Sequence, residues 1–277
     1  MKDLRTITKG IKELPPLPEV AQKVFSLLND PKSNVQDLVK VIQLDQAMTA
    51  NILKLCNSAY FALKRKISSL QEALVLLGQK NLHEIIMTDN SGKYYQRAGA
   101  GYSLGKGELW RHSVACALLS QILVRKTGLP EDPFLFTAAL LHDIGKVILS
   151  TYVKTEYDQI IRLVKEQQYP FLQAEKEIIG IDHAELGGRI AEEWNFPGAL
   201  VEAIAQHHTP DTENYISCIV HLCNLMTIMM GIGTGYGLAD YGKDAVMKKL
   251  GLKERHLESC MVELWHELQK AEDLLKC

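Results

Sequence analysis

The stretch LLHDIGKVIL, residues 140–149, places a histidine and an aspartate side by side in an otherwise apolar run, and Lys146 follows one helical turn after His142. Polar groups are costly to bury without partners, so His142 and Asp143 are either a satisfied structural pair or the centre of a metal site. Neighbouring positions of a helix diverge by about 100°, and we expect the two side chains to reach different parts of one cavity.

The segments around this stretch predict helices. Apolar residues recur at helical spacing, and no segment shows sustained alternation with a period of two. Ser33 and Ser69 each start a capping-box pattern, Asp45 is a candidate N-cap, and Gly78 is a candidate helix end. Further helices are expected at about 108–127, 132–149, 155–168, 183–194, 198–208, 213–230, 238–250 and 253–275. The sequence therefore predicts an all-α protein.

Length and composition indicate a globular chain with a substantial core. The 277 residues correspond to one large domain or two ordinary ones, and 47% of them are hydrophobic. Five glycines between residues 91 and 107 mark a boundary or a mobile segment. We therefore divide the chain into an N-terminal helical half (1–90), a glycine-rich connection (91–107), a half with the His/Asp cluster (108–230) and C-terminal helices (231–277). The final segment of the chain, residues 252–276, is either a packing helix or a dimerisation seam.

Charge and cysteine usage exclude several classes. A net charge of −2 gives no electrostatic case for binding nucleic acid or an anionic membrane. The first ten residues hold no apolar core of the kind a signal peptide needs, so we expect no signal peptide. The most apolar run, residues 216–233, is interrupted by His221 and Asn224, so a buried helix explains it better than a membrane span. The six cysteines lie among apolar residues without a C-x-x-C pair, so we expect reduced core thiols of a cytoplasmic protein rather than a disulfide frame or a zinc site.

Five histidines follow one another in a suggestive order: His112, His142, His183, His207 and His208. A single buried histidine most often serves as a structural hydrogen-bonding group. That interpretation is less favoured where several histidines lie near carboxylates on helices. Glu108 is such a carboxylate, four residues before His112 and therefore on the same helix face. Imidazole and carboxylate together suit iron, manganese or zinc, so the cluster predicts a divalent-metal site.

This order, with the His-Asp pair inside LLHDIGK, resembles the HD superfamily of metal-dependent phosphohydrolases, an all-α fold. The resemblance implies that His142 and Asp143 ligate metal, that the aspartate often bridges two ions, and that Lys146 contacts a substrate phosphate. It further implies that His112 is the upstream metal ligand and that a second ion is held by His183, His207 and His208. Glu108 matches an extra carboxylate of some HD-GYP members.

Longer phrases narrow the resemblance to the HDOD family over about residues 12–230. They are LPPLPEV, LDQAMTANILKLCNSAYF and ISSLQEALVLLG in the first half, and IGIDHAELGGRIAEEWNFP, AIAQHH and IVHLCN in the second. HDOD proteins are bacterial signalling and regulatory domains, most without established catalytic activity. The resemblance implies an N-terminal helical bundle packed on an HD-like half, and a signalling protein as partner.

The sequence departs from both families at informative positions. Active HD enzymes end the constellation with an aspartate, where this chain has Asn224, and an amide oxygen is a weaker, neutral ligand. Typical HDOD domains have a degraded His-Asp pair, whereas this chain keeps it. TPDTEN after His208 lacks the Gly-Tyr-Pro signature, which argues against hydrolysis of a cyclic dinucleotide.

These features leave three hypotheses. The first is a regulatory HDOD module that acts through a protein partner and binds metal without robust catalysis. The second is a metal-dependent phosphohydrolase, a phosphodiesterase or phosphatase acting on a phosphorylated small molecule or nucleotide, in which a bound metal activates water. The third is a purely structural or redox- and metal-sensing role. We favour the regulatory module.

Overall fold

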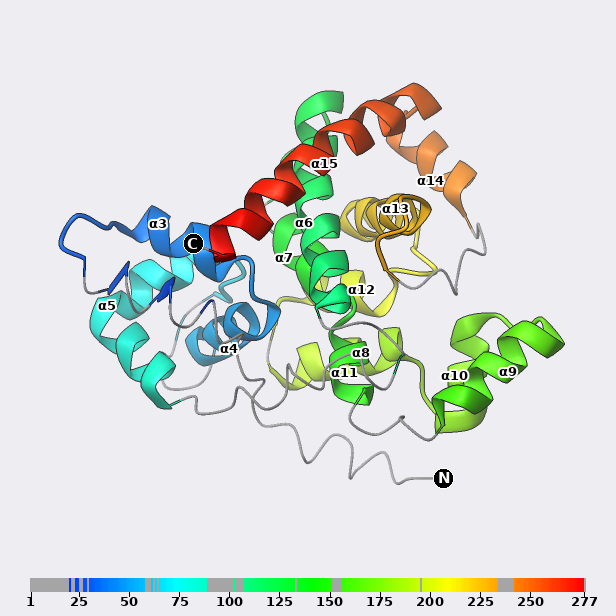
Figure 1. The fold of residues 1–277 in the computed structure, drawn as a ribbon, viewed down its shortest axis with the longest axis horizontal. Coiled ribbons are helices and arrows are strands. Elements are labelled where there is room, and N and C mark those ends of the chain that lie inside the picture. The colour runs from blue at the N-terminus through cyan, green and yellow to red at the C-terminus, as the bar shows by residue number, and fades with distance from the viewer. Residues whose placement is uncertain are drawn as a thin grey trace.

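The structure is a computed structural model with an all-α fold (Figure 1). It describes residues 30–57, 65–88, 107–132, 134–150, 156–194, 196–233 and 242–276, together with Val20, Lys23, Val24, Leu27, Leu28, Phe61, Leu63 and Tyr102. Within these ranges the regular elements are helices and no strand occurs, so the predicted fold class is confirmed.

The N-terminal group, on the left of Figure 1, includes α3 (Val35–Ile42), α4 (Gln46–Cys56) and α5 (Leu70–Thr88) among the described residues. The predicted cap at Ser33 is wrong by one residue. Asn34 caps α3 instead, because its side chain accepts backbone N–H bonds while Asp37 completes the reciprocal capping box. Asp45 caps α4 as predicted, accepting from the backbone N–H of Met48 at 2.8 Å. Gly78, with φ of 69° and ψ of 167°, interrupts helical geometry inside α5, so the predicted helix end coincides with a kink between two helical segments.

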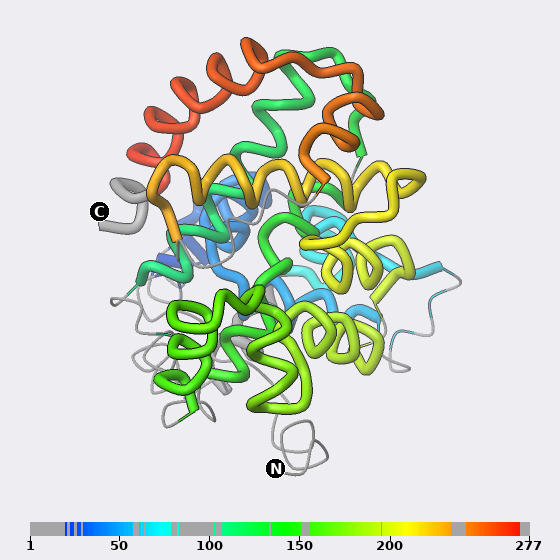
Figure 2. Tube along the Cα trace, turned by 90° about the vertical axis from the view of Figure 1, so that its right-hand side faces the viewer, coloured from blue at the N-terminus to red at the C-terminus, as the bar shows by residue number. Residues whose placement is uncertain are grey.

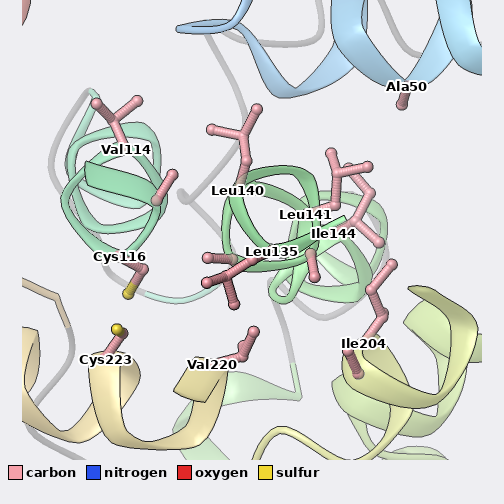
Figure 3. Packing of buried hydrophobic residues seen from close by; sticks show 14 of the residues in the cluster. Ala50, Val114, Cys116, Leu135, Leu140, Leu141, Ile144, Ile204, Val220 and Cys223 are labelled. Atoms are coloured by element: carbon pink, nitrogen blue, oxygen red, sulfur yellow. The ribbon is translucent and has the colours of Figure 1, made fainter. Parts of the chain in front are cut away.

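The second group surrounds the His-Asp pair. Its helices are α6 (Glu108–Thr127), α7 (Leu135–Leu141), α8 (Ile144–Leu149), α9 (Tyr157–Gln167), α10 (Phe171–Ile179), α11 (His183–Glu193), α12 (Gly198–Ala205) and α13 (Tyr215–Met229). Helix α6 packs against α7 and α13, and α7 also contacts α4 and α12. Buried side chains of α6, α8, α12 and α13 lie around those of α7 (Figure 3). Helix α7 thus lies at the centre of the fold and connects the two groups.

The predicted single helix 132–149 is wrong, because the chain leaves helical geometry at the His-Asp pair. Helix α7 ends before His142, and Asp143 has φ of −95° and ψ of 16°, outside the helical region. Helix α8 then begins at Ile144. The expected divergence of the two side chains does not occur either, since His142 Nε2 lies 3.5 Å from Asp143 Oδ2.

Helix α8 approaches α11 unusually closely, and Gly145 makes this possible. A Cβ at Gly145 would lie 1.9 Å from the backbone oxygen of His183 and 3.1 Å from the backbone nitrogen of Gly187. No side chain fits in that space. The glycine of the HDIGK stretch therefore brings Asp143 within reach of His183.

Helices α9 and α10, at the lower right of Figure 1, form a separate hairpin. Helix α9 was predicted, but α10 was not. Phe171, Ala174 and Ile179 on its buried face give it an amphipathic pattern, and Glu175 interrupts that pattern with a buried charge.

At the C-terminal end, α14 (Lys243–Leu250) leads into α15 (Glu254–Lys276), which crosses the top of the molecule (Figure 2). Leu257, Leu264 and Leu268 are buried and α15 packs along α6, which supports the packing-helix alternative. The predicted connection 91–107 lies outside the described residues except for Tyr102 and Gly107, and the division into four parts stays a prediction. None of the described helices combines the length and the hydropathy that a bilayer-spanning helix needs.

Candidate metal centre

Asp143 stands at the centre of a ring of histidines that come from separate helices. Its Oδ1 lies 3.3 Å from His183 Nε2 and 3.5 Å from His207 Nε2. Its Oδ2 lies 3.6 Å from His112 Nε2 and 3.5 Å from His142 Nε2. One carboxylate therefore faces two pairs of imidazoles, one pair at each oxygen.

Backbone carbonyls fix the orientation of three of these imidazoles. The Nδ1–H groups donate to them in the pairs His112 to Ile232 at 2.9 Å, His142 to Ala139 at 2.7 Å and His207 to Ile204 at 2.8 Å. A carbonyl oxygen only accepts, so each Nδ1 carries the proton and each Nε2 presents a lone pair. Metal-binding histidines are held in the same way.

Glu175, which no sequence pattern predicted as part of the site, orients the fourth imidazole. Its Oε2 accepts from His183 Nδ1 at 2.6 Å and from the His183 backbone N–H at 3.1 Å, while Tyr102 donates to Oε1 at 2.7 Å. In metal sites, histidine ligands typically donate their other ring N–H to a carboxylate in this way. The available signal was a glutamate on the apolar face of a short amphipathic helix.

Charge around Asp143 is balanced by Lys146. Burial alone raises the pKa of a carboxyl, but the pKa of Asp143 is held well below its ordinary value, chiefly by the ammonium of Lys146, 2.8 Å away. Asp143 is therefore an anion in a site where it is fully buried.

For four of the imidazoles, by contrast, the environment favours the neutral form. Burial is the main reason that the pKa is lowered for each of four histidines, namely His112, His142, His207 and His208. Neutral imidazoles with Nε2 free are the form in which histidine binds metal.

These donors fit a cation. The Nε2 atoms of His112 and His142 face each other at 3.3 Å, and those of His183 and His208 at 2.9 Å. Facing lone pairs repel unless a proton or a metal ion lies between them. The donor atoms form two groups, and within each group all donor atoms lie within 4.8 Å of one another. The first group is made of Asp143, His183, His207 and His208, and the second of His112, Cys116 and His142. The structure thus brings together all five predicted histidines and the aspartate.

Two predicted ligands stand apart. Glu108 is exposed in the first turn of α6 and belongs to neither donor group. Asn224 is buried on α13, and its Oδ1 makes no hydrogen bond within the described residues. Thr227, three residues further, places Oγ1 3.4 Å from His112 Nδ1, so this part of α13 borders the centre. Metal coordination by Glu108 or Asn224 stays a prediction.

An all-α fold around a buried cluster of histidines and an aspartate is the arrangement that the sequence resemblance implied. A model of the HDOD domain matches residues 14–210, and the chain belongs to the HDOD family. The structure of an HDOD domain protein with unknown function from Geobacter sulfurreducens is similar, with a TM-score of 0.55, 25% identity and coverage of 98% of this chain and 96% of that one.

Further relatives extend the likeness. The structure of the MmoQ response regulator from Methylococcus capsulatus superposes with a TM-score of 0.69 at 21% identity, covering 91% of this chain and 98% of that one, and shows the same fold. An uncharacterized protein of Treponema pallidum is 24% identical over 73% of this chain, and the protein YuxH of Bacillus subtilis is 28% identical over 56%. The matched part is only 39% of each of these two longer relatives.

Proposed function

We propose that this chain is a regulatory HDOD module that holds a divalent metal ion at the Asp143 centre and acts through a signalling protein, without robust catalysis. The observation that carries the proposal is that the donor set is assembled but enclosed. Its core members are at most 3% exposed, namely His112, His142, Asp143, His183 and His207. A single ion fits among such donors, whereas a phosphorylated substrate needs an approach that these buried atoms do not offer.

The position of Lys146 supports this proposal. The HD resemblance assigns this lysine to a substrate phosphate, but its ammonium is bonded to Asp143 and the residue is only 6% exposed. A lysine in this position neutralises the aspartate and is not presented to a ligand from solvent. Asn224, in place of a last carboxylate, removes a negative charge from the implied ligand set.

The family supports a role in signalling. The structurally similar MmoQ is a response regulator, and proteins of that kind transmit a state to a partner. A metal ion that binds residues from several helices would stabilise one conformation of such a module. Iron, manganese and zinc all suit the imidazole and carboxylate donors.

A second candidate is a metal-dependent phosphohydrolase acting on a phosphorylated small molecule or nucleotide. The intact His-Asp pair, with one carboxylate oxygen facing each group of histidines, favours it. A bound metal ion would supply an activated water and stabilise charge on phosphoryl oxygens. The partly exposed His208 marks the side from which a substrate would have to approach.

Metal analysis followed by turnover assays separates the two functions. Purified protein loaded with Mn²⁺ or Zn²⁺ is incubated with a generic phosphodiester and a generic phosphomonoester, beside the Asp143→Asn variant as background. We expect bound metal in the wild type and hydrolysis no faster than in the variant. Hydrolysis that requires Asp143 would establish the phosphohydrolase and refute the proposed non-catalytic role.

A further inference from the structure

Cys116 lies beside the metal centre, although none of the positions implied by the HD resemblance includes it. It follows His112 by four residues on α6, so both side chains lie on the same helix face. Its Sγ is 3.8 Å from His112 Nε2, and the thiol is fully buried. The donor atoms of His112, Cys116 and His142 lie within 4.8 Å of one another.

The spacing of these atoms matches a zinc coordination sphere. With bond lengths of about 2.05 Å to nitrogen and about 2.3 Å to sulfur, tetrahedral Zn²⁺ separates two nitrogen ligands by about 3.3 Å and a nitrogen from a sulfur by about 3.6 Å. The corresponding distances are 3.3 Å between His112 and His142 and 3.8 Å between His112 and Cys116. Side-chain shifts of a few tenths of an ångström complete the match.

We propose that His112, Cys116 and His142 form a thiolate-containing position for Zn²⁺, beside a sulfur-free position made of Asp143, His183, His207 and His208. This inference rests on the metal centre of the proposed function and assigns its two halves different chemistry. Asp143 Oδ2, at 3.6 Å and 3.5 Å from the two histidines, lies at the distance of a further ligand.

Charge gives an independent reason for a thiolate here. The HD resemblance places its last carboxylate at Asn224, a neutral residue. Thr227, on the same part of α13, places Oγ1 3.2 Å from Cys116 Sγ, so the sulfur borders the helix that lacks the carboxylate. A coordinated thiol is deprotonated by the metal, and Cys116 then provides the negative charge that Asn224 does not.

A thiolate also sets the metal preference. Sulfur ligands favour zinc over harder ions, whereas manganese and magnesium prefer oxygen. We expect removal of the sulfur to weaken Zn²⁺ binding at this position strongly and Mn²⁺ binding little.

Cys223 provides a matched control. It projects from α13 toward α6, facing Cys116 (Figure 3), and is equally buried, but it does not belong to the donor group. Replacing either cysteine by alanine removes one buried sulfur at the same interface between helices.

Cobalt substitution tests the proposal directly. Metal-free wild type, Cys116→Ala and Cys223→Ala are titrated with Co²⁺, and sulfur-to-cobalt charge-transfer absorption is recorded in the near ultraviolet. We expect the band in the wild type and in Cys223→Ala, and its loss in Cys116→Ala with cobalt still bound at the sulfur-free position. A band that persists in Cys116→Ala, or no band in a wild type that holds cobalt, would overturn the thiolate position alone. Failure of the wild type to bind cobalt would overturn the whole metal centre.

Zinc-edge X-ray absorption of the wild type provides a readout that does not depend on the folding of any variant. We expect a sulfur scatterer at about 2.3 Å from zinc. A first shell of nitrogen and oxygen only would refute the role of Cys116 while leaving the metal centre in place.

Discussion

Glu175 determines how His183 presents its ligand atom. It binds the imidazole Nδ1 and the backbone N–H of the same residue, and Tyr102 in turn holds the carboxylate. A carboxylate that accepts the Nδ1–H of a ligating histidine raises the basicity of Nε2 and fixes the tautomer, so we expect Glu175 to contribute to metal binding without touching the ion.

Glu175→Gln is therefore expected to weaken metal binding about 10- to 100-fold, the usual cost of losing the hydrogen-bond partner of a ligating histidine. Glu177→Gln on the same helix is the matched control, because Glu177 is exposed and borders no ligand. Isothermal titration of the metal-free variants with Zn²⁺ measures both affinities. Equal losses in the two variants, or none in Glu175→Gln, would show that Glu175 does not support the site.

Asn224→Asp tests whether α13 contributes a ligand. A carboxylate adds a full charge, and two unit charges about 4 Å apart at an effective dielectric near 20 interact by about 4 kcal/mol, before desolvation is subtracted. We expect tighter Mn²⁺ binding in the variant, measured by isothermal titration against the wild type. Unchanged affinity would mean that residue 224 does not face the metal.

The sequence predicted the histidines and the aspartate that converge in the structure, but not the residues that support them. The five histidines and Asp143 do converge, because a His-Asp pair in an apolar run has few other ways to be buried. Glu175 and Cys116 were missed for different reasons. The unpredicted α10 concealed Glu175, and Cys116 looked like one more apolar core residue until the fold brought His142 beside it.

At the scale of elements, the junction of α7 and α8 and the contact of α8 with α11 create the centre. The break at the His-Asp pair turns both side chains toward each other, and Gly145 allows α8 to touch the first turn of α11. Periodicity alone predicted one continuous helix at 132–149, since the residues on both sides of the break are apolar and compatible with a helix. The turn is set by contacts between helices, which no local pattern contains.

Gly145→Ala is expected to destabilise the protein by about 3 kcal/mol or more, because the added methyl group would meet backbone rather than a flexible side chain. Metal affinity falls with it, since Asp143 moves away from His183. Gly198→Ala is the control, because no atom lies within 4 Å of its Cβ position and α12 accommodates alanine. Chemical denaturation monitored by circular dichroism measures both. Similar stabilities of the two variants would contradict the close-contact account.

At the scale of the whole molecule, the donors join helices that are distant in sequence. They come from α6, from the α7–α8 junction, from the start of α11 and from the segment after α12. Metal bound by the two donor groups cross-links the second group of helices, and the binding energy adds to the free energy of unfolding.

Removal of metal is accordingly expected to lower the melting temperature. At a free metal concentration about a thousand times the Kd, binding stabilises the fold by about 4 kcal/mol, and this corresponds to roughly 10 °C for a chain of this size. Thermal unfolding of metal-loaded and chelator-treated protein measures the shift, with His207→Gln as the variant that should respond less. Identical melting curves with and without metal would argue against a metal that joins these helices.

Anomalous diffraction from crystals of the metal-loaded protein tests the central claim, that Asp143 is shared between two groups of ligands, most directly. Data collected at the absorption edge of zinc or manganese are predicted to show metal within coordination distance of Asp143. The expected peaks lie toward His183, His207 and His208 on one side and toward His112, Cys116 and His142 on the other. Crystals in which no peak lies near Asp143, although the protein was saturated with metal, would contradict the account.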